Sequence, residues 1–136
     1  MKQQLLEVIK AFGEKIERSV ASPAKSGLFT VNSNSESLSE EKMDIFHSVI
    51  AIMLYLSRRV RPDLDAVIYF LTQCVSCSDV EDWGILRRML TFVYNIIDDV
   101  RVIAADYFHR LFVWIDTANA VHLNVHNHTG GAIFIS

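Results

Sequence analysis

The chain has 136 residues, 51% of them hydrophobic, and its formal net charge is −3. This length allows one domain with a buried core, and the hydrophobic content argues against a disordered chain. The negative charge excludes a nucleic-acid binder that relies on overall charge, so any such binding would need a local basic patch. The longest strongly apolar stretch, residues 49–56, is far shorter than the roughly 20 residues of a membrane-spanning helix.

The N-terminal segment has charges throughout and no continuous apolar region, which is unlike a secretory signal. We therefore expect an intracellular protein, cytoplasmic or nuclear, that is not secreted and does not associate with a membrane. In that reducing environment Cys74 and Cys77 are expected to be free thiols.

Apolar spacing predicts an amphipathic helix over residues 3–18. Its inward face would hold Leu5, Leu6, Val8, Ile9, Phe12 and Ile16. Residues 20–39 differ in character, because they combine Pro23 and Gly27 with many serines and only short apolar spots. This segment is predicted to be a linker or an extended arm that lies on a surface.

A second helix is predicted over residues 41–59, preceded by the capping-box spacing of Ser37 and Glu40. Its buried stripe would comprise Ile45, Val49, Ile52, Met53 and Leu56. A third helix is predicted to start at Pro62, whose fixed φ suits a first helical position, and to run to about Thr72. Its inward residues would be Leu64, Val67, Ile68 and Leu71.

A fourth helix is predicted after a second capping box, Ser78 and Glu81, and it fades near Tyr94. Its buried residues would be Trp83, Leu86, Met89, Leu90 and Val93. Beyond the turn at Asp98-Asp99, runs rich in β-branched and aromatic residues predict strands at VRVIAA, RLFVWID and AIFIS. We therefore predict an α+β fold, in which a helical bundle is followed by a short antiparallel β meander.

Two residue pairs have spacings that occur in zinc sites. Cys74 and Cys77 form a CxxC pair, and His122 and His126 form an HxxxH pair. The pairs are much farther apart in the chain than the two halves of a zinc finger. A pair of free thiols, together with a polar turn holding His122, His126 and His128 before Gly130-Gly131, explains the same residues without a metal.

Two basic clusters could touch phosphates if the helices bring them onto one face. Arg58, Arg59 and Arg61 form the first cluster, and Arg87 and Arg88 form the second. Solvated helix ends explain the same residues, since cations stabilise the negative C-terminal end of a helix.

Asp116 follows the apolar run LFVWI, at the end of a predicted strand. Two-metal nucleases place a magnesium ligand at such a position, but a pair of magnesium ions needs about four carboxylates. No Asp or Glu follows Asp116 in this sequence, and a turn-forming aspartate is the simpler interpretation.

Several stretches, in this order, resemble the Pol polyprotein of copia-type LTR retrotransposons, from the segment after the polymerase palm into RNase H. The resemblance covers about residues 20–134, and the order and spacing of the stretches make it specific. The core stretches are IFHSVIAIMLYLSRR, VRPDLDAVIYFLTQCV, DVEDWGILRRMLTFV, WIDTANAVH and NHTGG, preceded by ASPAKSGLFTVN and SESLSEEKMDIFH.

The resemblance implies three parts: an N-terminal helix and serine-rich arm (1–40), a thumb- and connection-like helical region (41–97), and the first strands of an incomplete RNase H-like domain (98–136). It implies that the helical region packs beside an RNA–DNA hybrid and that Arg58, Arg59 and Arg61 lie near the backbone of that duplex. Asp116 would be the first RNase H carboxylate and a Mg²⁺ ligand in the complete parent enzyme. The stretch from His122 to Gly131 would be the hairpin turn between the first two strands.

The departures from the family matter equally. The palm motif with its paired aspartates, the fingers and the later RNase H carboxylates are absent from this sequence. We therefore expect a truncated copy that is catalytically inactive by itself, binds no cofactor alone, and has an RNA–DNA hybrid or the rest of a Pol polyprotein as its partner. Residues 100–136 should be poorly stable unless helices cover them. The alternatives are a non-enzymatic nucleic-acid or protein binding module and a zinc-binding α+β protein.

Overall fold

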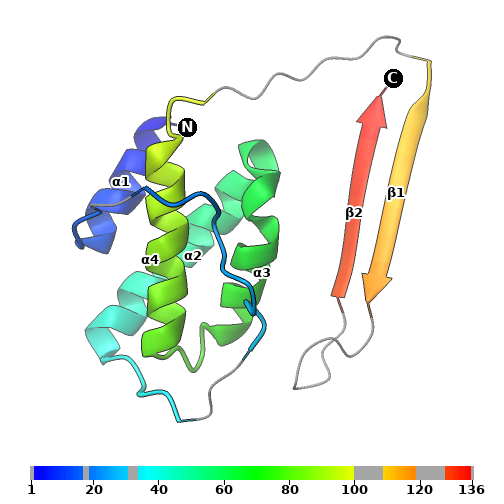
Figure 1. The fold of residues 1–136 in the computed structure, drawn as a ribbon. Coiled ribbons are helices and arrows are strands. Elements are labelled where there is room, and N and C mark those ends of the chain that lie inside the picture. Colours follow the sequence, from blue (N-terminus) through cyan, green and yellow to red (C-terminus); the bar gives the residue numbers. More distant parts are fainter. Residues whose placement is uncertain (1, 17–18, 31–33, 100–108, 119–127, 136) are drawn as a thin grey trace. The chain divides into compact units, whose positions relative to one another are not determined.

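The structure, a computed structural model, describes residues 2–16, 19–30, 34–99, 109–118 and 128–135 (Figure 1). The chain divides into two compact units, one made of residues 1–28 and 32–99 and the other of residues 29–31 and 100–136. The described part of the first unit is helical, and that of the second is a two-stranded antiparallel sheet. The predicted α+β class, with helices before strands, is therefore confirmed.

The helical unit consists of four α-helices and one short 3-10 helix among its described residues. They are α1 (Lys2–Phe12), α2 (Glu40–Val60), η1 (Pro62–Leu64), α3 (Asp65–Cys74) and α4 (Val80–Asn95). In Figure 1, α1 and α3 flank α4, and each of these two helices also contacts α2 behind it. This arrangement encloses one hydrophobic core between the four helices.

The first helix is shorter than its apolar spacing predicts. It ends at Phe12, and Gly13 follows with φ at +75°. A left-handed residue directly after the last turn is a common helix terminator, and glycine adopts it without steric cost. The predicted extension of the helix is therefore wrong over residues 13–16, and its last two residues, 17 and 18, lie outside the described residues. Ile16 still packs against the core from the loop.

Both predicted capping boxes lie at the wrong residues. The N-cap of α2 is Ser39, whose Oγ accepts from the Lys42 backbone N–H, and not Ser37. The N-cap of α4 is Asp79, which forms a reciprocal capping box with Asp82 in place of Ser78 and Glu81. In each case a serine upstream offers a competing start signal, and the helix begins at the later cap.

The core confirms the predicted buried faces of the third and fourth helices, and Pro62 does open the helical segment that leads into α3. The face of α2 is partly wrong, because Ile52 is 43% exposed whereas Phe46 and Ile50 are buried. On α1, Leu6 is 37% exposed, so the inward face is narrower than predicted.

The arm between α1 and α2 is attached to the helical unit. Its first part crosses α4 and then descends beside α3 in Figure 1. Near its end, the Leu38 N–H donates to the Ser78 carbonyl oxygen and the Val80 N–H donates to the Glu36 carbonyl oxygen. Leu38 itself is buried, so the arm adds to the core as well as running over the surface.

The second unit pairs β1 (Leu111–Ala118) with β2 (His128–Ile135), in a register that sets Asp116 opposite Gly130. The last predicted strand therefore begins four residues earlier than AIFIS, and the expected turn at Gly130-Gly131 is wrong, since both glycines lie within β2. The predicted strand at 100–105 lies outside the described residues. Large apolar side chains of the pair are exposed: Leu111, Phe112, Val113, Trp114, Ile115, Ile133 and Ile135.

Candidate nucleic-acid interface

The C-terminal end of α2 carries two exposed arginines, Arg58 and Arg59. The Arg59 guanidinium carbon lies 5.0 Å from the centroid of the Tyr55 ring, one turn earlier on the same helix. Tyr55 is itself 52% exposed. Neither arginine forms an ion pair within the part of the chain that the structure describes. Their charges are therefore available to an external anion.

Arg61 differs from its two neighbours. It binds Asp63 through two nitrogens, with Nη2–Oδ2 at 2.7 Å and Nε–Oδ1 at 2.9 Å. Its side chain is only 15% exposed, and its guanidinium lies 5.7 Å from the Phe92 ring centroid. A bidentate pair of this kind satisfies the arginine charge locally. Arg61 therefore holds the end of α2 near α4 and offers little positive charge to a phosphate.

In the second basic cluster, Arg87 and Arg88 contact different partners. Arg87 is exposed and its Nη1 lies 3.5 Å from Glu14 Oε2, just after α1. Arg88 is half-buried, and its Nη2 donates to Ser22 Oγ in the arm at 3.2 Å. Adjacent positions on a helix point in different directions, so these two arginines do not present one common surface.

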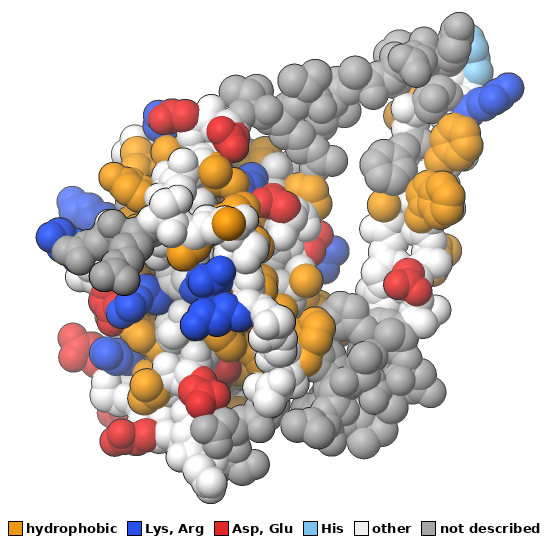
Figure 2. Space-filling view, in the orientation of Figure 1, with side chains coloured by type: hydrophobic (Ala, Val, Ile, Leu, Met, Phe, Trp, Pro, Cys, Tyr) orange, Lys and Arg blue, Asp and Glu red, His pale blue; other side chains and the backbone are white. Residues whose placement is uncertain are grey.

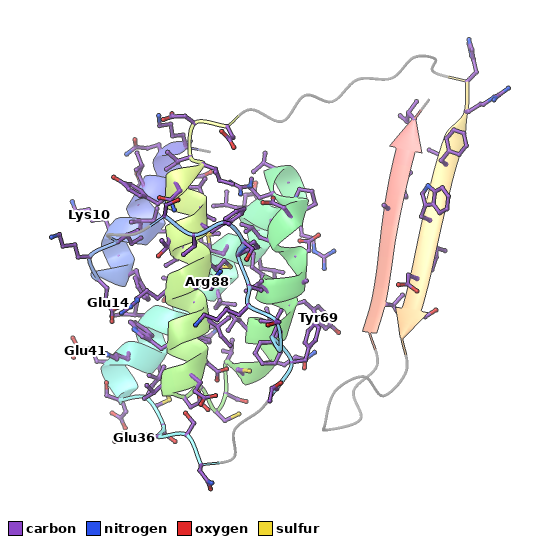
Figure 3. All side chains as sticks on the ribbon, viewed as in Figure 1. Lys10, Glu14, Glu36, Glu41, Tyr69 and Arg88 are labelled. Atoms are coloured by element: carbon purple, nitrogen blue, oxygen red, sulfur yellow. The ribbon has the colours of Figure 1, made fainter. Side chains whose placement is uncertain are left out.

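Acidic side chains further divide the basic surface. Figure 2 shows blue and red side chains interspersed over the visible face of the helical unit. Figure 3 labels Lys10, Glu14, Glu41 and Glu36 one after another down one side of the helical unit, so a single lysine is followed there by three carboxylates. Among the described residues, the positive charge of the predicted basic clusters is therefore least compensated by carboxylates at the exposed end of α2.

Asp116 is exposed and lies within β1, which continues for two residues beyond it to Ala118. Its cross-strand partner Gly130 supplies no side chain, so no second carboxylate faces it across the pair. No group of three His, Cys, Asp or Glu side chains suited to a metal ion occurs among the described residues. Among the described residues of the strand pair, Asp116 is the one carboxylate, whereas two-metal chemistry needs several.

The two cysteines are free, and their environments differ. Cys74 is half-buried and its Sγ donates to the Phe70 carbonyl oxygen at 3.6 Å. Burial, and to a lesser degree the nearby Asp82 carboxylate, raises the pKa of the Cys74 thiol to about 12. Zinc binds a thiolate, so this environment disfavours Cys74 as a ligand. Of the predicted partners, His122 and His126 lie outside the described residues.

Sequence reasoning missed the contacts that decide which arginines are available. Glu14 accepts a hydrogen bond from Trp83 Nε1 at 2.7 Å as well as facing Arg87, and no local pattern predicts a partner so distant in the chain. The Arg61–Asp63 pair could have been suspected, because the two residues flank a proline that starts a helix. The Tyr55–Arg59 contact follows from an i, i+4 spacing on α2.

None of the described helices is both long enough and apolar enough to cross a lipid bilayer. Among the predicted site residues that the structure describes, those that remain as candidates for function are the exposed arginines at the end of α2 and Asp116 on β1. No protein-family model, no curated protein and no solved structure matches this chain.

Proposed function

We propose that the chain is a fragment of a copia-type retrotransposon Pol polyprotein, whose parent activities are RNA-directed DNA synthesis and degradation of the RNA in RNA–DNA hybrids. The observation that carries this proposal is the ordered set of resembling stretches. Support also comes from their positions, since each of the first three stretches spans one helical segment: IFHSVIAIMLYLSRR lies on α2, VRPDLDAVIYFLTQCV covers η1 and α3, and DVEDWGILRRMLTFV lies on α4.

The helical unit would then be thumb- and connection-like, and β1–β2 would be the first strands of an RNase H-like domain. Asp116 would correspond to the first metal-binding carboxylate of that domain. These 136 residues hold no Asp or Glu after Asp116. We therefore propose that they do not catalyse hydrolysis by themselves, and that Mg²⁺ belongs to the complete parent enzyme.

The experiment that tests this proposal has two arms. In the first arm, the genomic DNA on both sides of the reading frame is sequenced. Coding sequence for the polymerase palm and for the rest of RNase H is expected there. Flanks that contain an independent promoter and no retrotransposon sequence would contradict the origin.

The second arm incubates the chain and its Asp116→Asn variant with a labelled RNA–DNA hybrid and Mg²⁺. Equal, background-level cleavage is expected from both proteins. Cleavage by the parent chain that Asp116→Asn abolishes would contradict the proposed inactivity while leaving the origin intact.

A second candidate function is a non-enzymatic module that binds nucleic acid. The observation that favours it is the exposed group of Tyr55, Arg58 and Arg59 at the end of α2. An arginine contacts the phosphate backbone through charge-assisted hydrogen bonds, and an exposed aromatic ring can stack on an unpaired base. This function needs neither the sheet nor a metal ion, so it can persist in a chain that has no catalytic site.

A further inference from the structure

Ser22 fastens the arm to α4. Its Oγ donates to the Ala24 carbonyl oxygen at 2.7 Å and accepts a hydrogen bond from Arg88 Nη2 at 3.2 Å. Ala24 and Leu28 pack against the core on either side of exposed residues 25–27. The serine hydroxyl therefore lies where the arm passes over α4, in contact with a cation.

Among the described residues, the half-buried Arg88 guanidinium has no carboxylate partner. Its Nε is buried and has no hydrogen-bond partner. Within the described ranges, Arg88 forms no ion pair with any carboxylate, and its Nη2 donates to the neutral Ser22 hydroxyl. A buried donor without a partner carries a desolvation penalty, and an anion placed beside Ser22 would remove it.

The sequence around Ser22 is Ser-Pro-Ala-Lys, residues 22–25. A serine followed by proline, with a basic residue two positions further on, is the pattern that proline-directed protein kinases favour. Proline also biases the preceding residue toward an extended backbone, which suits a peptide bound in a kinase cleft. Ala21 and Lys25 are exposed, Ser22 is partly exposed, and no helix or strand occupies the described residues from Gly13 to Ser39.

We propose that Ser22 is a phosphorylation site and that Arg88 holds the phosphate. In this step the Ser22 Oγ forms a bond to the γ-phosphorus of a nucleoside triphosphate, and the bond from that phosphorus to the β,γ-bridging oxygen breaks. The hydroxyl proton passes to the catalytic base of the kinase, and the nucleoside diphosphate leaves. The product is a phosphoserine with about −1.5 to −2 charges and three strong acceptor oxygens.

The phosphate would lie beside two donors of Arg88, the unpartnered Nε and the Nη2 that now donates to the Ser22 hydroxyl. Nη2 already contacts Oγ, and Nε lies in the same guanidinium plane, so two parallel N–H···O bonds can form. Because these bonds join the arm to α4, phosphorylation should tighten the arm on the helical unit. The modification would therefore act as a switch on the segment that connects α1 to α2.

The test phosphorylates the native, full chain with a proline-directed kinase and ATP, and locates the phosphate by mass spectrometry. Thermal unfolding of the helices is then compared between modified and unmodified protein by circular dichroism. We expect phosphate on Ser22 and a melting temperature raised by about 3–5 °C, which is what two charge-assisted hydrogen bonds at a half-exposed site should give. In an Arg88→Gln chain phosphorylated in the same way, the increase should vanish.

Two control variants sharpen the result. Ser22→Ala should abolish phosphate incorporation, whereas Ser26→Ala, in the same arm but without a following proline, should leave it unchanged. No phosphate at Ser22 in the native chain, or an increase in melting temperature that persists in Arg88→Gln, would overturn the proposal. An equal increase produced by inorganic phosphate without kinase would overturn it as well, because the site would then take a free anion.

Discussion

The Phe12 ring stacks on the Trp83 indole, with ring centroids 4.6 Å apart and 27° between the ring planes. This contact joins the last turn of α1 to the first turn of α4. Two other segments meet the same indole, since its Nε1 donates to Glu14 and Lys42 Nζ lies 5.0 Å from the ring centroid. Through these contacts, Trp83 connects α4 with three other segments: the end of α1, the loop that follows α1, and the start of α2.

Truncating Phe12 should destabilise the whole helical unit. The side chain is 2% exposed, so Phe12→Ala leaves a cavity beside Trp83 and should lower the free energy of unfolding by about 3–5 kcal/mol. Urea unfolding followed by helical circular dichroism measures this loss. The matched control is Leu6→Ala, because Leu6 is partly exposed on α1. This substitution should lower the free energy of unfolding by less than about 1 kcal/mol. Equal losses in the two variants would show that α1 is not anchored through Phe12.

The elements differ in how well their sequence predicts them. The buried faces of α3 and α4 could be predicted because apolar residues line one side of each helix. On α2 apolar residues occur around most of the helix, so spacing alone could not choose between Ile52 and Ile50. That choice is made by α1 and α3, which pack against α2 from distant parts of the chain.

The candidate site was also only partly predictable from the sequence, because contacts between distant parts of the chain decide its properties. The positions of the arginines are plain from the sequence, but the charge that each one offers depends on tertiary partners. Arg87 lies close to Glu14, and Arg88 donates a hydrogen bond to Ser22. Both partners precede α2 in the sequence, so they are far from α4 along the chain. The short-range Asp63 partner of Arg61 was open to sequence reasoning, whereas the partners of Arg87 and Arg88 were not.

Asp82 should make stability depend on pH. It is buried at the start of α4, and burial raises the pKa of its carboxyl above the ordinary 3.8, although the hydrogen bond from the Asp79 backbone acts in the opposite direction. Because the native state holds this proton more tightly than the unfolded chain, the associated stability is fully present below pH 3.8 and is lost as the pH rises through the folded-state pKa.

Asp82→Asn removes this titration while its amide oxygen can still accept from the Asp79 N–H. The variant should therefore gain stability relative to the parent chain as the pH rises from about 3 to about 7. Urea midpoints at stepped pH values measure the difference. Glu40→Gln, an exposed carboxylate in the first turn of α2, is the matched control. Parallel pH profiles for the parent and Asp82→Asn would refute the prediction.

The two cysteines should react at very different rates. Because the thiolate is the nucleophile, a Cys74 thiol with a pKa of about 12 should alkylate slowly at pH near 8, while the exposed Cys77 should alkylate first. Iodoacetamide labelling followed by peptide mass spectrometry measures both rates. The difference should disappear in concentrated urea, where burial is lost. Comparable rates in the native chain would contradict the environment described for Cys74.

The β1–β2 pair should be less protected against amide exchange than the helices of the first unit. Its large apolar side chains are exposed, and an isolated two-stranded sheet is marginally stable at best. Hydrogen exchange read by mass spectrometry should therefore show residues 111–118 and 128–135 exchanging much faster than α2 and α4. Protection of the two strands equal to that of the helices would mean that something covers their apolar side chains.

The end of α2 should dominate any binding of nucleic acid. Arg58 and Arg59 are exposed and unpaired by carboxylates in the described residues, whereas Arg61 is neutralised by Asp63. The double substitution Arg58→Ala and Arg59→Ala should therefore weaken binding of an RNA–DNA hybrid by roughly tenfold or more at low salt. It should also reduce the slope of log K against log salt concentration by about one for each phosphate that the protein no longer neutralises.

Fluorescence anisotropy with a labelled hybrid over a salt series measures both quantities. Lys10→Ala serves as the charge control, because Lys10 is exposed on α1, away from the end of α2. Arg61→Ala tests the role of pairing, and its effect on the salt slope should be small because its charge is already satisfied by Asp63. A slope reduced by the same amount per charge removed in all three variants would mean that binding follows net charge alone. The absence of binding at low salt would remove the binding function altogether.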